Sequence, residues 1–153
     1  MQQIANQLIN DQLAEIKQAL KTVGADTYDL LLPETYALVN LLQVDEYIAA
    51  IVYGKYRQMK SENEIITGRG ALIITDKRVM LVDKKPLFLR YDEVPFQVVI
   101  GVTYSRIGLA GTIVLHSRIG DITIRTFNHT CATIFVAAVE AKLFENNQSR
   151  GLL

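Results

Sequence analysis

Residues 70–83 read Gly70-Ala71-Leu72-Ile73-Ile74-Thr75-Asp76-Lys77-Arg78-Val79-Met80-Leu81-Val82-Asp83. Two short apolar runs, 71–74 and 79–82, flank a polar break at 75–78. Each run is too short for a helix and is rich in Ile, Leu and Val, which is typical of a buried strand. Within the break, Asp76 suits an Asx-type turn. This stretch therefore predicts two antiparallel strands joined by a tight turn, and we expect Arg78 to anchor that turn.

The same alternation of strand and turn signals continues on both sides of this hairpin. The connections between apolar runs are too short for crossover helices, so the strands are expected to pair in an antiparallel sheet. The final run is the clearest, because Ile122 and Ile124 alternate with polar residues behind a turn at Gly120. The predicted strands cover residues 47–56, 70–74, 79–82, 87–91, 98–104, 112–117 and 121–127.

Helical periodicity occurs both before and after the predicted strands. Before them, apolar residues recur at three- and four-residue steps up to Gly24, which predicts one amphipathic helix ending there. A second helix is expected to begin at Pro33, with residues 26–29 forming the turn between the two. After the strands, a last helix is expected to begin at Asn128 or Thr130 and to end at 146–147. The apolar positions of the first helix are Ile9, Leu13, Ile16, Leu20 and Val23.

These elements predict a mainly β fold of the α+β class. Seven antiparallel strands form a strongly bent sheet or partly open barrel, capped by the C-terminal helix and preceded by a helical hairpin. Residues 1–44 are the helical segment, which is too small to be an independent domain, and residues 45–148 are the domain proper.

Composition narrows the class of protein. The chain has 153 residues, 50% of them hydrophobic, with 16 Lys and Arg against 16 Asp and Glu, which excludes a disordered chain and argues against a dedicated nucleic-acid binder. The single Cys131 cannot form an internal disulfide, and residues 1–4 lack a signal-peptide pattern, so we expect a cytoplasmic protein. The most apolar stretch, 98–115, contains Arg106 and is expected to form strands, not a membrane span.

Few side chains could support catalysis. His116 and His129 are the two histidines, and no Ser or Cys lies in a recognisable nucleophile motif. Cys131 is expected to be a small buried hydrophobe, and together with the histidines it lacks the spacing of a zinc site. Gly68-Arg69-Gly70 lacks the Lys-Ser/Thr pair of a phosphate loop. We therefore predict no enzyme, no cofactor and no metal site.

Positive charge concentrates in the first half of the sheet, since residues 47–90 contain nine bases and four acids. These bases are either a solvated outer face or a surface for an anionic ligand, such as the headgroups of an anionic membrane. Nucleic acid is a third ligand, with Tyr53 and Tyr56 as stacking platforms, and the balanced overall charge disfavours it. The candidate anionic-ligand surface consists of Lys55, Arg57, Lys60, Arg69, Lys84 and Lys85.

The stretch at 70–83 also resembles a known family, the bacterial pleckstrin-homology-like (PH-like) domains of the YokE-like type. The shared pattern is Gly, apolar run, Thr-Asp-x-Arg, apolar run, with supporting matches at 91–95, 100–102 and 108–113. The resemblance covers roughly residues 45–145 and implies a seven-stranded sheet with a C-terminal helix, no catalytic residues and frequent homo-oligomers. Eukaryotic pleckstrin-homology domains bind inositol phosphates through a Lys followed by Arg-x-Arg. Here Lys60 and Arg69 match, but Ala71 replaces the second Arg.

The resemblance therefore implies a non-catalytic binding or scaffolding module, with a protein partner or self-assembly into a homo-oligomer. The alternative is a peripheral adaptor that binds anionic lipid surfaces. Phosphotyrosine-binding domains share this architecture and add a peptide to a sheet edge, which by analogy would lie along residues 98–104. The apolar stripe of the first helix must also be buried, either on its own sheet or on another subunit. The candidate peptide-binding edge consists of Val98, Val99, Ile100, Val102 and Tyr104.

Overall fold

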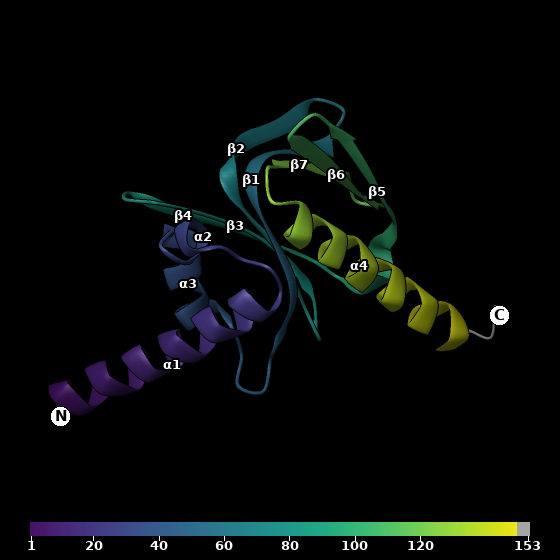
Figure 1. The fold of residues 1–153 in the computed structure, drawn as a ribbon. Coiled ribbons are helices and arrows are strands. Elements are labelled where there is room, and N and C mark those ends of the chain that lie inside the picture. The colour runs from purple at the N-terminus through teal and green to yellow at the C-terminus, as the bar shows by residue number, and fades with distance from the viewer. Residues whose placement is uncertain (150–153) are drawn as a thin grey trace.

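The computed structural model describes residues 1–149 and contains one sheet and four α-helices (Figure 1). Three helices precede the strands: α1 (Gln2–Thr22), α2 (Thr27–Leu30) and α3 (Pro33–Leu41). The strands and closing helices are β1 (Ile48–Ser61), β2 (Glu64–Thr75), β3 (Val79–Lys85), β4 (Phe88–Val94), the 3₁₀ helix η1 (Phe96–Val98), β5 (Val99–Ile107), β6 (Ala110–Ser117), β7 (Ile122–Thr126) and α4 (His129–Ser149). All seven predicted strands are present, so the predicted fold class is confirmed.

The strands form one antiparallel sheet in the order β4-β3-β2-β1-β7-β6-β5. Gly54 of β1 pairs with Gly70 of β2. A Cβ atom on Gly54 would lie 1.9 Å from the Arg125 carbonyl oxygen, and one on Gly70 would lie 2.4 Å from that of Val82. Glycine is therefore required at both positions, because neighbouring strands approach too closely for a side chain.

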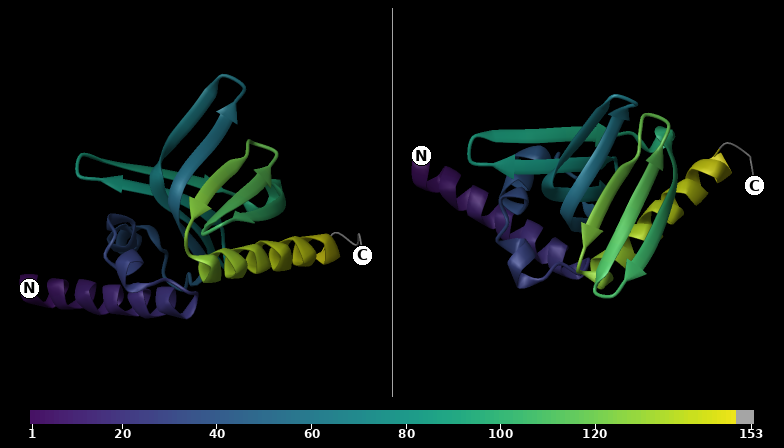
Figure 2. Two further views of the ribbon diagram at one scale, coloured as in Figure 1. Left: turned by 45° about the horizontal axis from the view of Figure 1, so that its top comes forward. Right: turned by 90° about the horizontal axis from the view of Figure 1, so that it is seen from above.

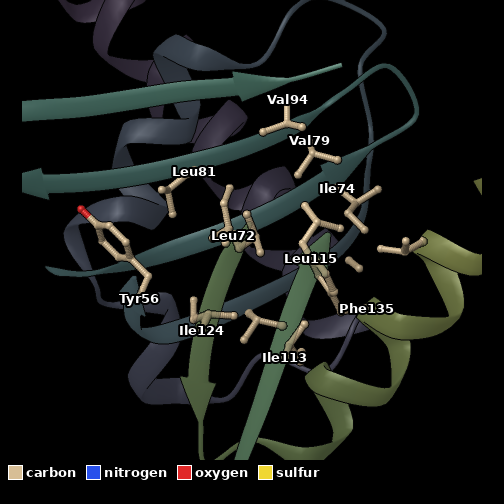
Figure 3. Close-up of a cluster of buried hydrophobic side chains, with 14 of the residues drawn as sticks. Tyr56, Leu72, Ile74, Val79, Leu81, Val94, Ile113, Leu115, Ile124 and Phe135 are labelled. Atoms are coloured by element: carbon tan, nitrogen blue, oxygen red, sulfur yellow. The ribbon is translucent and has the colours of Figure 1, made fainter. Parts of the chain in front are cut away.

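Both faces of β1–β3 are buried, which explains the continuous apolar runs in these strands. On the inner face, Leu72 and Ile74 pack with Phe135 of α4 (Figure 3). On the outer face, Ile51 and Ile73 pack against the N-terminal helices, which lie behind the sheet in Figure 3. The C-terminal part of the α1 stripe, namely Ile16, Leu20 and Val23, is therefore buried within its own chain, whereas Ile9 is 49% exposed. The outer-face cluster includes Ile16, Leu20, Leu30 and Leu38.

Three local predictions need correction. Residues 26–29 do not form a plain turn, because Asp26 and Asp29 make a reciprocal capping box that starts the short helix α2. The last helix does not end at 146–147 but continues to Ser149. Its start is as predicted, since the Cys131 amide donates to Asn128 Oδ1 at 3.0 Å.

The third correction concerns the turn at 75–78. The side chain of Asp76 does not stabilise this turn, because its Oδ1 accepts a hydrogen bond from the Tyr47 amide at 2.8 Å. Thr75 Oγ1 takes that role, accepting the amides of Lys77 and Arg78, each at 3.1 Å. The turn is therefore an ST-turn, and the aspartate instead connects the turn to the chain just before β1.

Arg78 anchors this turn, as predicted. Its Nε and Nη2 donate to the two carboxylate oxygens of Glu46 at 2.9 and 2.8 Å. Nη2 also donates to the Leu41 carbonyl at 2.7 Å, and Nη1 to the hydroxyl of Tyr91. The side chain of Glu46 is fully buried, and that of Arg78 is 10% exposed. Arg78 thus connects the end of α3, the segment before β1, and β4.

Candidate ligand-binding cleft

Three basic side chains lie side by side on the outer face of the sheet. Lys55 of β1 is in direct register with Arg69 of β2 and with Arg125 of β7. Directly opposed residues of an antiparallel pair have Cβ atoms about 4.5–5.5 Å apart, and like charges in such positions are destabilising. Within the described part of the chain, no carboxylate oxygen lies within 4.0 Å of any of the three. We call Arg69, Lys55 and Arg125 the basic row.

A cleft of about 880 Å³ separates the basic row from the N-terminal helices. Its opposite wall carries Asp26, Asp29 and Glu34. Asp29 and Glu34 are almost fully buried, and burial raises the pKa of each carboxyl. The cleft is therefore basic along the sheet and acidic along the helices.

Hydrogen bonds fix the acidic wall in place. Glu34 Oε2 accepts the backbone amide of Lys84 at 2.8 Å, which ties α3 to β3. The hydroxyls of Thr35 and Tyr53 are 2.6 Å apart and tie α3 to β1. Asn128 Nδ2 donates to the Gly24 carbonyl at 2.9 Å, which joins the start of α4 to the end of α1. The two walls are thus held at a set separation before any ligand binds.

Two aromatic side chains stand at the cleft with most of their surface in solvent. Phe127, between β7 and α4, is 74% exposed, and Tyr28 of α2 is 72% exposed. Leu32 also contributes to the lining. An exposed aromatic beside unpaired charges is typical of a binding surface, because it offers apolar contact next to the polar contacts.

The structure divides the six basic residues predicted as one anionic-ligand surface. Lys55 and Arg69 belong to the basic row. Lys60 is paired with Asp92 at 3.3 Å, and Lys85 is paired with Asp83. Side chains two residues apart in a strand point to the same face. Arg57 is two residues after Lys55 in β1, and Lys84 is two residues after Val82, which is part of the outer-face cluster, so both lie on the same face as the basic row.

Sequence reasoning missed Arg125. The basic residues were counted over 47–90, whereas Arg125 lies far downstream and joins Lys55 only through the pairing of β1 with β7. The alternation in β7 was the available signal, because Ile122 and Ile124 point inward and Arg125 therefore points outward.

The predicted peptide-binding edge is only partly available. Val98 lies in η1 and not in the strand, which is a correction to the predicted range. Val99 is buried, while Val102 and Tyr104 pack against the inner core. Ile100 is the one well-exposed side chain of these five residues, at 60%. The predicted edge at residues 98–104 therefore presents little apolar side-chain surface on which a peptide could pack.

The histidines and the cysteine lie in separate environments. His116 contacts Asp121 at 3.1 Å, and His129 Nδ1 lies 2.6 Å from the Tyr104 hydroxyl. Cys131 is buried, and burial raises the pKa of its thiol to about 12. Among residues 1–149, no group of three or more His, Cys, Asp or Glu side chains could hold a metal ion. No helix in the same part of the chain is long and apolar enough to cross a membrane.

Comparison with known proteins places this geometry in a family. Seven antiparallel strands closed by a C-terminal helix define the pleckstrin-homology (PH) class of fold, whose members are commonly non-catalytic binding or scaffolding modules. A family model described as bacterial PH domain matches residues 42–141, which is more than half of the chain. The chain belongs to the bacterial PH domain family, which confirms the predicted family, while the YokE-like type stays a prediction. A search of curated proteins finds no match.

Several solved structures are similar in fold. The Vps36 N-terminal PH domain is 19% identical, with a TM-score of 0.49 over 71% of this chain and 86% of that chain. The linker-DH/PH domains of p115-RhoGEF are 10% identical (TM-score 0.42, 86% of this chain and 39% of that one). The DH/PH fragment of PDZRHOGEF, solved with human RhoA, is 11% identical, with a TM-score of 0.43 over 88% of this chain and 40% of that chain. The chain thus spans about two fifths of these two DH/PH fragments.

Proposed function

We propose that this chain is a non-catalytic binding module that takes an extended acidic segment of a protein partner into the cleft. The observation that carries the proposal is the basic row, in which three cations are aligned in register with no carboxylate partner among residues 1–149. Such an alignment opposes folding, so it is best explained by an anionic group that binds there. The carboxylates of the partner would pair with Arg69, Lys55 and Arg125.

The shape and charge of the cleft favour a single peptide over other polyanions. A flat bilayer does not enter a concave cleft, and a nucleic acid would bring phosphates against Asp26 and Asp29 on the opposite wall. An extended peptide can turn its acidic side chains to the sheet and its neutral side chains to the helices, because successive side chains point to opposite faces. Phe127 and Tyr28 then offer contact for an apolar residue of the partner.

Charge reversal of the basic row tests this proposal. A fluorescein-labelled peptide of alternating glutamate and serine is titrated with the chain, and binding is followed by fluorescence anisotropy. We expect the triple variant K55E/R69E/R125E to weaken binding at least tenfold. Three lost ion pairs of about 0.5 kcal/mol each already remove about 1.5 kcal/mol, and repulsion adds to this.

The matched control reverses three exposed bases elsewhere, in the variant K21E/K77E/R106E, and so changes the net charge by the same amount. This control is expected to keep most of the affinity. Equal losses in the two triple variants would show that net charge alone drives binding and would refute the cleft proposal. Equal binding of a lysine–serine peptide by the unchanged protein would also refute it.

The basic row also predicts that removing one of its charges weakens peptide binding but stabilises the fold. Replacing Lys55 by threonine removes the central cation between two arginines and introduces a residue that favours strands. We expect K55T to raise the free energy of unfolding by about 0.5 kcal/mol while weakening peptide binding. Arg57 is the control, because its cross-strand partners are Thr67 and Thr123, and R57T should give no such gain. Urea denaturation of both variants checks this, and a loss of stability in K55T would contradict it.

Self-association and a cytoplasmic location stay predictions. The C-terminal part of the α1 stripe is not available to another subunit, because Ile16 and Leu20 pack in the outer-face cluster. Mass measurement by light scattering would determine whether the chain assembles through another surface. An oligomer would strengthen binding to a partner that carries several acidic segments, because linked sites raise the effective concentration.

A further inference from the structure

The acidic wall of the cleft, which consists of Asp26, Asp29 and Glu34, has no counter-ions within the described chain. Asp26 is the N-cap of α2, Asp29 is the third residue of that helix, and Glu34 lies in the first turn of α3. Among residues 1–149, no Lys, Arg or His nitrogen lies within 4.0 Å of these three carboxylates. The acidic wall therefore resembles the basic row in carrying three charges without an ion-pair partner.

Two of these carboxylates are buried with one oxygen left without a hydrogen bond. Asp29 is 7% exposed and Glu34 is 5% exposed. The hydrogen bonds of residues 1–149 reach Asp29 Oδ2 and Glu34 Oε2, but not Asp29 Oδ1 or Glu34 Oε1. Within the same range, Gln58 Oε1 is the only fully buried side-chain oxygen or nitrogen without a partner. The unbonded oxygens of Asp29 and Glu34 therefore keep access to solvent, and both residues line the cleft.

The two buried carboxylates also act on the same point of the cleft. Tyr53 of β1 lies in the lining, where burial raises the pKa of its hydroxyl and the charges of Asp29 and Glu34 raise that pKa further. Burial raises the pKa of Asp29 and Glu34 as well, and the charge of Asp26 adds to the effect on Asp29. A nearby positive charge favours the ionised form of a carboxyl, so a bound cation would offset these costs.

The acidic wall and the basic row face each other from different layers of the molecule. The helices α2 and α3, blue in Figure 2, lie on one side of β1–β3, and α4 lies on the other (Figures 1 and 2). The basic row is on the outer face of the sheet, toward α2 and α3. An extended segment between the two walls points successive side chains to opposite faces. Every second side chain of the segment would thus meet cations, and the others would meet carboxylates.

We propose that the acidic wall binds a basic side chain of the partner, so that the segment taken into the cleft alternates acidic and basic residues. This inference rests on the proposed function and refines it, because the side chains that face the helices become basic instead of neutral. Lysine suits the acidic wall, since its long stem carries an ammonium with three donors for the unbonded oxygens of Asp29 and Glu34. Such a segment has no net charge, so the cleft selects a pattern of charge and not its total.

Three fluorescein-labelled peptides of equal length test this pattern by fluorescence anisotropy. In each, glutamate alternates with one other residue, which is serine, lysine or acetyllysine. Acetylation removes the charge of lysine but keeps its stem. We expect the glutamate–lysine peptide to bind the unchanged protein at least about fivefold more tightly than either other peptide, which is the effect of one ion pair of about 1 kcal/mol. If it binds no more tightly than the acetyllysine peptide, the proposal is wrong.

Neutral substitutions of similar shape assign the effect to the acidic wall. The variant D29N/E34Q keeps carbonyl oxygens that can accept the two backbone amides now bound there. We expect it to lose the preference for the glutamate–lysine peptide and to bind the glutamate–serine peptide at least as tightly as the unchanged protein does, which shows that its cleft is folded. The control D11N/E140Q neutralises two exposed carboxylates outside the cleft and should keep the preference. A preference retained in D29N/E34Q would overturn the proposal.

The same peptides separate this inference from the proposed function. If the glutamate–serine peptide binds through the basic row but the glutamate–lysine peptide gains nothing, the proposed function stands and the inference about the acidic wall is wrong. If K55E/R69E/R125E leaves binding of the glutamate–serine peptide unchanged, the proposed function fails, and this inference fails with it.

Discussion

Replacing Arg78 by alanine is expected to lower the free energy of unfolding by about 3–5 kcal/mol. The substitution removes both hydrogen bonds to Glu46 and leaves a fully buried carboxylate without its counter-ion. It also removes the donor to the Leu41 carbonyl, at the end of α3. One side chain therefore ties residues 41–46 to the turn at 75–78, and urea denaturation of R78A would measure its contribution.

The neighbouring Lys77 is the control for this prediction, because its side chain is exposed. We expect K77A to change stability by less than about 0.5 kcal/mol. In the double variant E46M/R78M both partners are removed, so no buried charge remains unpaired, and part of the lost stability should return. A loss below about 1 kcal/mol in R78A would show that this buried pair does not anchor the fold.

The same ion pair predicts how stability depends on pH. Burial raises the pKa of Glu46, but hydrogen bonds from Arg78, the Gln43 amide and Thr75 outweigh it and lower the pKa to about 2. Because the folded-state pKa lies below the ordinary value of 4.5, the stabilisation is fully present above pH 4.5 and is lost as the pH falls toward 2. Between these values R78A should lose less stability than the unchanged protein does. Parallel stability curves for the two proteins would contradict the assignment.

Replacing Leu38 by alanine is expected to lower the free energy of unfolding by about 2–5 kcal/mol. Leu38 of α3 is fully buried in the outer-face cluster, together with Ile73 and Met80 of the sheet. Because the helices cover the apolar outer face of β1–β3, we propose that residues 1–44 unfold together with the sheet, as one cooperative unit. A single transition, seen alike by a helix probe and a sheet probe, would support this proposal.

Leu8 provides the control for L38A, since it belongs to α1 but is 64% exposed. The variant L8A should change stability by less than about 0.5 kcal/mol. Two separate transitions, with the sheet melting unchanged in L38A, would show that the helical segment is an independent unit.

The fold was predictable because local signals and tertiary packing agree. The runs at 71–74 and 79–82 identified a hairpin from their length and composition, and both strands are present. The errors lie where several polar residues compete for the same role. Thr75 and Asp76 can both stabilise a turn, and the choice depends on Tyr47, which is brought near only by the folded sheet.

The candidate site was only half predictable. Lys55 and Arg69 were identified from the excess of bases in residues 47–90, but Arg125 joins them through strand register, which local sequence does not reveal. Conversely, Lys60 was expected at the site, yet Asp92 of β4 pairs with it. The acidic wall was not predicted, since it depends on how the helices pack on the sheet.

The most direct test of the cleft as the binding site is a chemical-shift map. The chain is labelled with nitrogen-15 and titrated with the glutamate–serine peptide, and the backbone amide shifts are followed by NMR. We predict that the largest changes fall on Lys55, Arg69, Arg125 and Asn128, around the cleft. Changes concentrated along β5 and α4, with the basic row unaffected, would contradict the account and move the binding site to the sheet edge.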